Sequence, residues 1–208
     1  MSYPDQKKSV GRTLVRDGLY HDMVIQHILP FGFRDTEKAV WTCLQEIGLG
    51  SVEDVKDYSK HVDYHPQHEE MSDNTFITNF FVSTPDQKEI RGVQARQVVR
   101  KYIEETLTVF ICQTPCTPRL EGIDSAAGHQ ISNMLRVTVE HQTLQGEDAA
   151  ASVLRLHFTT PSREIYSMNS SFRAPGLHLT ITHLEIISCR LPNAVENFLV
   201  DNSARASC

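Results

Sequence analysis

The clearest pattern in the chain is an alternation of apolar and polar residues in two neighbouring segments, 131–144 and 151–159. Their apolar positions are Leu135, Val137, Val139, Leu154, Leu156 and Phe158. A period of two residues is typical of an antiparallel strand with one solvated face. Because residues 145–148 between them contain Gly146 and two acidic residues, the pattern predicts a hairpin of two paired strands.

Two more segments have the composition of strands. Residues 75–83 carry, on one face of the expected strand, Phe76, Thr78, Phe80 and Val82. Residues 106–113 are rich in β-branched and aromatic residues. Proline cannot donate a ladder hydrogen bond, so we expect Pro115 and Pro118 to end this second strand.

Three other segments have ambiguous patterns. Residues 19–29 and 91–105 each fit both a strand and a helix, although Pro30 prevents a helix from continuing cleanly beyond Leu29. Residues 52–70 are polar, rich in histidine and contain Pro66. We expect that last segment to be a short helix followed by a loop, or a poorly ordered crossing.

A helix is predicted between Pro30 and Gly50. Asp35 or Thr36 can cap its N-terminus, and Gly48 and Gly50 can stop it. The apolar positions that fall one turn apart are Val40, Trp41, Leu44 and Ile47. They give the helix one apolar face for packing against a core.

The last third of the chain gives conflicting indications. Apolar residues at helical spacing are Leu177, Ile181, Leu184, Leu191, Val195 and Phe198. Several β-branched residues in 180–187 disfavour a helix, and Pro192 would break or kink one. We expect a bent helix from Leu177 to Val200.

Composition is that of a single globular domain. The chain has 208 residues, of which 40% are apolar and 22% charged, and this balance disfavours disorder and coiled coil. We expect a polar N-terminal lead-in at 1–17, one domain at 18–201 and a flexible C-terminal tail at 202–208.

Charge and apolar runs narrow the range of partners and compartments. A net charge of −6 with scattered Lys and Arg disfavours nucleic acid and anionic membranes as partners. No apolar run reaches the roughly 20 residues of a transmembrane helix, and Met1–Lys8 is polar where a secretory signal would be apolar. Five cysteines, an odd number, fit reduced thiols. We therefore expect a cytoplasmic protein.

No motif indicates catalysis, a metal site or a cofactor. Metal-ligand types gather in one polar segment at His61, Asp63, His65, His68, Glu69 and Glu70. Pro66 lies between His65 and His68 and prevents these residues from sharing a helix face. Cys112 and Cys116 have three residues between them, one more than redox pairs have, and are interpreted as buried free cysteines. Phosphate-binding glycine loops are absent from the sequence.

Order and spacing of three segments carry a family resemblance. They are Leu29–Phe33 leading into Thr36–Trp41, then Asp73–Phe76, then Arg96–Glu105. In this arrangement the chain resembles the START-like domains of the oomycete mating-specific protein group. Val195–Leu199 also resembles the usual end of that family's C-terminal helix. The resemblance extends over Gly18–Val200.

The resemblance implies an α+β helix-grip (START-like) fold, in which a curved antiparallel β-sheet wraps around a long C-terminal α-helix and an apolar cavity. It favours strands at 19–29 and 91–105. It also implies a module that binds a lipid or other apolar small molecule without catalysis. The residues expected to line the cavity are Phe76, Phe80, Phe110, Leu135, Val137, Leu154, Leu156, Ile181 and Leu184.

The chain departs from the family pattern at two places, and two alternative functions stay open. Residues 109–113 lack the usual Trp-Arg ending, and no Gly-Trp pair occurs near 129–137, so the pocket is expected to differ in shape. Related helix-grip folds include cyclases and dehydratases. For such an enzyme the first acid or base candidates would be Arg96, Tyr102, His141 and His157. The other alternative is a closed protein-interaction domain without a ligand.

Overall fold

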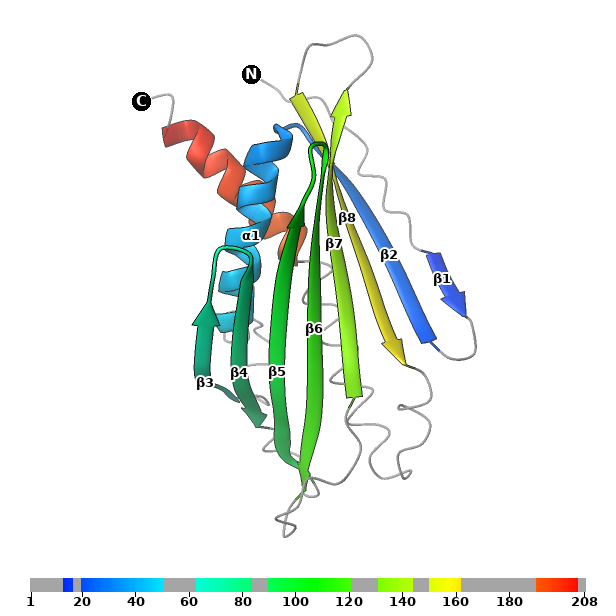
Figure 1. Ribbon diagram of the computed structural model, residues 1–208, viewed down its shortest axis with the longest axis vertical. Coiled ribbons are helices and arrows are strands. Elements are labelled where there is room, and N and C mark those ends of the chain that lie inside the picture. Colours follow the sequence, from blue (N-terminus) through cyan, green and yellow to red (C-terminus); the bar gives the residue numbers. More distant parts are fainter. Residues whose placement is uncertain are drawn as a thin grey trace.

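The described part of the chain forms one antiparallel β-sheet that carries two helices on the same face (Figure 1). The computed structural model describes residues 13–16, 20–50, 63–83, 90–120, 131–143, 150–161 and 190–205. The α+β class and the antiparallel sheet are therefore confirmed. The expected domain limits at 17 and 201 stay predictions.

The sheet has eight strands in the order β1-β2-β8-β7-β6-β5-β4-β3. The strands are β1 (Thr13–Arg16), β2 (Tyr20–Leu29), β3 (Asp63–Met71), β4 (Thr75–Ser83), β5 (Ile90–Ile103), β6 (Leu107–Leu120), β7 (Ile131–Thr143) and β8 (Ala150–Pro161). Consecutive strands are neighbours from β3 to β8, which is the meander that short connections favour. Strand β2 departs from this order, because it pairs with β8 and so brings an early strand beside the last strand of the described chain.

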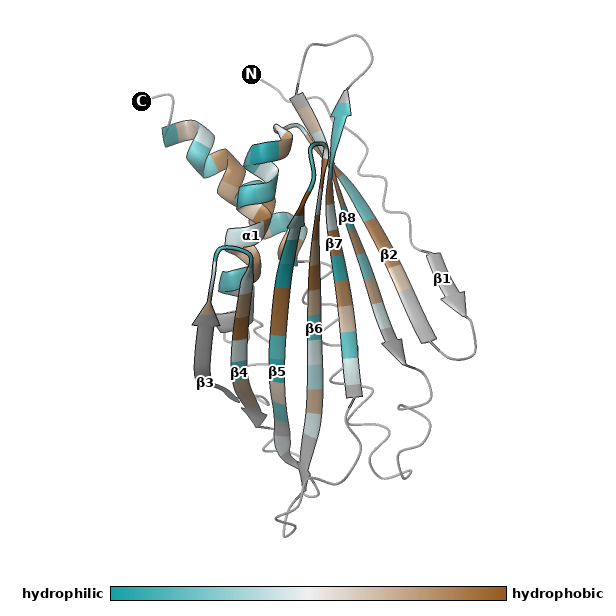
Figure 2. Cartoon of the chain, in the orientation of Figure 1, coloured by the Kyte–Doolittle hydropathy of each residue, from teal (hydrophilic) through white to brown (hydrophobic). Residues whose placement is uncertain are grey.

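Alternation along the strands separates two faces of the sheet. The face that carries the helices, called here the inner face, contributes most of the buried apolar residues. Its members in the core are Phe76, Val99, Phe110, Cys112, Leu135, Val137, Val139, Leu154, Leu156 and Phe158. Apolar and polar bands follow one another along β5, β6 and β7 (Figure 2). The predicted pairing of the last two strands is confirmed by the register Val137↔Leu156.

The first helix, α1 (Phe33–Gly50), begins before the expected caps. The Thr36 amide donates a hydrogen bond to the Gly32 carbonyl at 3.0 Å, so the first turn starts at Gly32. Thr36 is fully buried, and its hydroxyl bonds the Ser152 hydroxyl of β8 at 2.8 Å. Thr36 is therefore a contact between helix and sheet, and its prediction as an N-cap was wrong.

The C-terminal helix covers residues 190–205 of the described chain. Leu191, Val195 and Leu199 are spaced by four residues and pack into the same core as α1. Pro192 lies inside this helix and does not end it, and the helix continues five residues beyond the expected end at Val200. The earlier part of the expected helix, 177–189, lies outside the described residues.

The ambiguous segments resolve mostly as strands. β2 and β5 confirm the strands that the family resemblance favoured at 19–29 and 91–105. The expectation of a helix or loop for 52–70 was wrong from residue 63 onward, where β3 forms an edge strand. Pro66 is accommodated there because the register shifts between Pro66 and His68.

Strand β6 runs past both prolines that were expected to end it. The paired residues of β5 along β6 run from Ile103 to Val98 and resume at Ala95. Pro115 stands opposite that gap, and it has no amide hydrogen to donate. A local interruption of the ladder therefore lets the strand continue, and the predicted end at Gln113 was wrong.

A nearly buried ion pair fixes α1 to β5. The Lys101 ammonium lies 3.3 Å from Glu37 Oε1, and the two side chains are 12% and 8% exposed. The same ammonium lies 4.9 Å from the centre of the Trp41 ring. Arg34 also approaches Glu37, at 3.6 Å, but its side chain is 55% exposed.

We expect Lys101→Met to lower the free energy of unfolding by about 3 kcal/mol, because it leaves the Glu37 carboxylate buried without its main partner. Arg34→Gln, the matched control, removes an exposed pair on the same carboxylate and should cost roughly 0.5 kcal/mol or less. Chemical denaturation of both variants checks this. Equal losses for the two would show that the Glu37–Lys101 pair does not fix α1 to the sheet.

Candidate functional site

Six of the nine expected lining residues lie together in the core on the inner face. They are Phe76, Phe110, Leu135, Val137, Leu154 and Leu156. Phe80 is half-buried on the same face, two residues beyond Thr78 on β4. Ile181 and Leu184 lie outside the described residues. Whether these side chains line a cavity stays a prediction.

Helix α1 contributes more to this face than the sequence indicated. The half-buried Trp41 ring lies 5.4 Å from the Phe76 ring, edge to face, and 6.1 Å from the Phe110 ring, stacked. Trp41 therefore spans β4 and β6 from the helix side. The 3.6-residue period of α1 placed Trp41 on its apolar face, but the period alone could not show which strands it contacts.

Next to the apolar core, a row of neutral polar residues crosses four adjacent strands of the inner face. This polar row consists of Thr78 on β4, Gln97 on β5, Thr114 on β6 and Asn133 on β7. The register pairs Thr78 with Gln97 and Thr114 with Asn133. All four residues are buried, with 2 to 7% of their surface exposed.

The polar row adjoins the apolar residues on every one of its strands. On each strand, the residue two positions from the polar-row member lies on the same face and is apolar. These four residues are Phe76, Val99, Cys112 and Leu135. The polar row was not predicted from the sequence, because its residues occupy separate strands. Gln97 lies between the apolar inner positions Ala95 and Val99, and Asn133 precedes Leu135 and Val137, which is the one indication that the sequence offers.

One member of the polar row has an unpartnered atom. Asn133 Oδ1 is buried and accepts no hydrogen bond, although the residue is only 7% exposed. Thr108 Oγ1, in the apolar part of the inner face, is the same in this respect. A buried polar atom without a partner costs about 1–3 kcal/mol, and most buried side-chain polar atoms in proteins do have one. The Asn133 and Thr108 oxygens are therefore both exceptions to the usual pairing of buried polar atoms.

The four side chains considered for an enzymatic alternative do not converge. Arg96, Tyr102 and His141 are exposed, and His157 is half-exposed. Tyr102 lies on β5 and His157 on β8, with β6 and β7 between them. Their dispersal offers no shared acid–base site.

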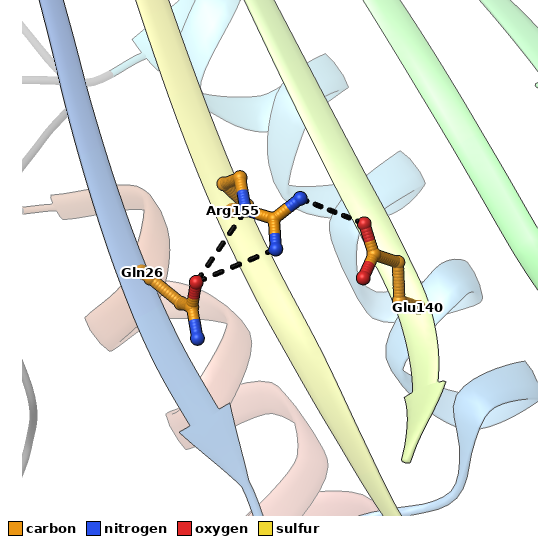
Figure 3. Close-up of polar contacts among 3 residues, drawn as sticks. All are labelled: Gln26, Glu140 and Arg155. Atoms are coloured by element: carbon orange, nitrogen blue, oxygen red, sulfur yellow. Dashed lines mark hydrogen bonds and ion pairs between the residues drawn. The ribbon is translucent and has the colours of Figure 1, made fainter.

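On the outer face, opposite the helices, a polar network joins three strands (Figure 3). Arg155 Nη1 of β8 donates to Glu140 Oε1 of β7 at 2.9 Å. Its Nε and Nη2 donate to Gln26 Oε1 of β2, each at 3.4 Å. The Arg155 and Glu140 side chains are 40% and 35% exposed, so this pair stabilises the sheet by only a fraction of 1 kcal/mol, about 0.5 kcal/mol.

The thiols of the described chain are not activated. Burial raises the pKa of Cys112 and of Cys116 to about 12. For Cys43 burial is the main cause and the Glu46 charge the second, and the pKa also rises to about 12. All three cysteines are free, so the interpretation of Cys112 and Cys116 as unpaired thiols is confirmed. Cys116, however, is only half-buried as a whole residue.

Two further findings concern metals and membranes. Within the described ranges, no three His, Cys, Asp or Glu side chains are placed to hold a metal ion together. His61 lies outside those ranges. In the same part of the chain, no helix has the length and apolar character needed to span a bilayer.

Comparisons with known proteins do not assign the chain to a family. No protein-family model and no curated protein matches the sequence. Among solved structures, the chain is similar to an uncharacterized protein from Rhizobium leguminosarum, with a TM-score of 0.41 and 12% identity over 88% of this chain and 95% of that one. It is also similar to human STARD10, with a TM-score of 0.41 and 7% identity over 98% of this chain and 78% of that one.

We expect Cys43 and Cys112 to resist iodoacetamide in the folded protein from pH 7 to pH 9. Their raised pKa leaves almost no thiolate there, and the thiolate is the form that reacts. In denaturant both should be alkylated fully, as free thiols with a pKa near 8.5 are. Peptide mapping by mass spectrometry measures this residue by residue. Rapid alkylation of Cys112 in the folded state would contradict its burial beneath the helices.

Proposed function

We propose that this chain is a START-like binding module that holds a lipid or other apolar small molecule against the inner face of the sheet. The ligand lies between the sheet and the C-terminal helix. It contacts the nine residues named from the sequence, including Ile181 and Leu184, and the protein performs no chemistry on it. The proposal also retains a cytoplasmic location and no role for nucleic acid.

The observation that carries this proposal is the buried polar row beside the apolar core. A sheet that only packs against helices gains most from apolar inner positions, because burying polar groups costs free energy unless they are paired. Here four polar side chains are buried in one row, and Asn133 Oδ1 has no partner. An apolar surface with a few converging polar groups is what small-molecule sites present.

The energy of binding would come mainly from apolar burial. Each Å² of apolar ligand surface removed from water contributes about 25 cal/mol, so a ligand chain held against the inner face gains affinity without any charge. The polar row then sets the ligand's direction. This division of roles needs no catalytic group, which fits the dispersal of Arg96, Tyr102, His141 and His157.

Native and denaturing mass spectra of the protein from a eukaryotic host test the proposal. We expect a discrete non-covalent adduct in the native spectrum that is lost on unfolding. After removal of the adduct, the protein should take up a neutral apolar dye, N-phenyl-1-naphthylamine, saturably. A bare mass together with no saturable dye uptake would overturn the proposal and favour a closed interaction domain.

Two matched Ala→Leu variants test which buried alanine borders the proposed ligand site and which belongs to the packed core. Ala95 lies on the inner face two residues from Gln97 of the polar row, opposite Phe80 and Cys116, and is 2% exposed. We expect Ala95→Leu to reduce dye uptake at least fivefold with little loss of stability, because its side chain enters space that the ligand uses. Ala39→Leu, at a fully buried position of α1 in the core, should instead cost about 1–3 kcal/mol by overpacking. Thermal unfolding and dye titration measure both effects. An equal loss of stability in both variants would place Ala95 in packed core.

A further inference from the structure

We infer that the bound molecule is an uncharged amphiphile whose polar end carries a hydrogen-bond donor, and that this donor binds Asn133 Oδ1. The inference rests on the proposed function and adds the chemical class of the ligand. It names a residue outside the nine expected contacts. The donor would be a hydroxyl or an amide N–H.

The absence of charge follows from the composition of the polar row. On β4 to β7 the row consists of two threonines, one glutamine and one asparagine, all buried. A carboxylate, phosphate or ammonium brought to this row would be taken out of water without an opposite charge beside it. Hydroxyls and amides, which are neutral, lose far less on the same transfer.

The nearest described cation on the inner face of β5 cannot serve as that opposite charge. Lys101 lies four residues from Gln97 along the strand, which is about 13 Å at 3.3 Å per residue. Its ammonium is already held by Glu37 at 3.3 Å and by the Trp41 ring at 4.9 Å. An anionic head at the polar row would therefore be too far from Lys101 to pair with it.

The need for a donor follows from Asn133 itself. The unpartnered atom, Oδ1, is a carbonyl oxygen and can only accept a hydrogen bond. A ligand hydroxyl or amide N–H would satisfy it, whereas an ether or ester oxygen would not. Leu135, two residues along β7 on the same face, would then contact the apolar part of the ligand next to its polar end.

Thr108 provides a matched control within the same sheet. Thr108 Oγ1 is also buried and unpartnered, but it lies six residues from Thr114 on β6, roughly 20 Å along the strand. Thr108 neighbours Val139, which belongs to the apolar core. Removing its hydroxyl should leave the ligand's polar end untouched.

Four probes with one C16 chain and different polar ends test the inference. They are hexadecan-1-ol, 1-methoxyhexadecane, palmitate and hexadecylamine, each used to displace N-phenyl-1-naphthylamine from the delipidated wild-type protein. We expect the alcohol to bind about tenfold tighter than the ether, as one hydrogen bond supplies. Both ionised probes should bind more weakly than the alcohol.

The Asn133→Leu variant should bind the alcohol only as tightly as it binds the ether, and its affinity for the ether should equal that of the wild type. Thr108→Val should retain the full preference for the alcohol. The wild-type ranking needs no variant, so the inference stays testable even if Asn133→Leu does not fold.

The outcomes distinguish this inference from the proposed function. If the dye binds and all four probes displace it equally, or if the ether, palmitate or amine binds tightest, the proposed function stands and the inference is overturned. A preference for the alcohol that survives in Asn133→Leu, or that is lost in Thr108→Val, also overturns it. If neither the dye nor any probe binds, the proposed function itself fails.

Discussion

The structure depends on one constraint. The apolar inner face of the sheet must be shielded from water by helices packed onto it. Its strands alternate apolar and polar residues over much of their length, so most of their buried apolar side chains lie on the inner face. Two helices from opposite ends of the described chain, α1 and the helix at 190–205, pack onto that face. α1 is held there by directional contacts as well as by apolar burial. They are the buried Thr36–Ser152 hydrogen bond and the Glu37–Lys101 ion pair.

The same constraint gives the polar row its significance. Exposed polar residues on a sheet need no account, but buried ones on the helix-bearing face are there at a cost. Thr78, Gln97, Thr114 and Asn133 stand in register on four strands, so they form one row and not four isolated exceptions. The unpartnered Asn133 oxygen, at the edge of an apolar surface, is the observation on which the proposed ligand binding rests.

Sequence reasoning predicted strands well where residues alternate, as at 131–143, and it found the apolar face of α1. It failed where a residue type was assumed to have one structural role, as with proline at a strand end or threonine at a helix N-cap. Pro115 and Pro118 were expected to end β6, yet the pairing with β5 breaks locally and the strand continues. Pro66 was one reason to expect a short helix and a loop at 52–70, although an edge strand with a register shift tolerates it. Thr36 looks like a cap in sequence, but its hydroxyl bonds a residue 116 positions away.

The polar row could not be predicted from sequence for a related reason. Its four members gain their meaning from strand register, which places residues from 78 to 133 side by side, and no local pattern contains that information. The apolar lining residues were easier to find, because period-two alternation within each strand already separates the faces. Even so, the alternation could not say whether such a residue contacts a ligand or only other core side chains.

A methyl-resolved NMR titration with hexadecan-1-ol tests the central claim most directly, because the two faces of the sheet carry separate sets of methyl groups. On the inner face the reporters are Val99, Leu135 and Val137. The matched outer-face reporters are Ile77, Val98 and Ile111, which are half-buried. Binding against the inner face predicts saturable shifts for the inner methyls and none for the outer ones. Shifts confined to the outer methyls, or saturable binding that moves neither set, would contradict it.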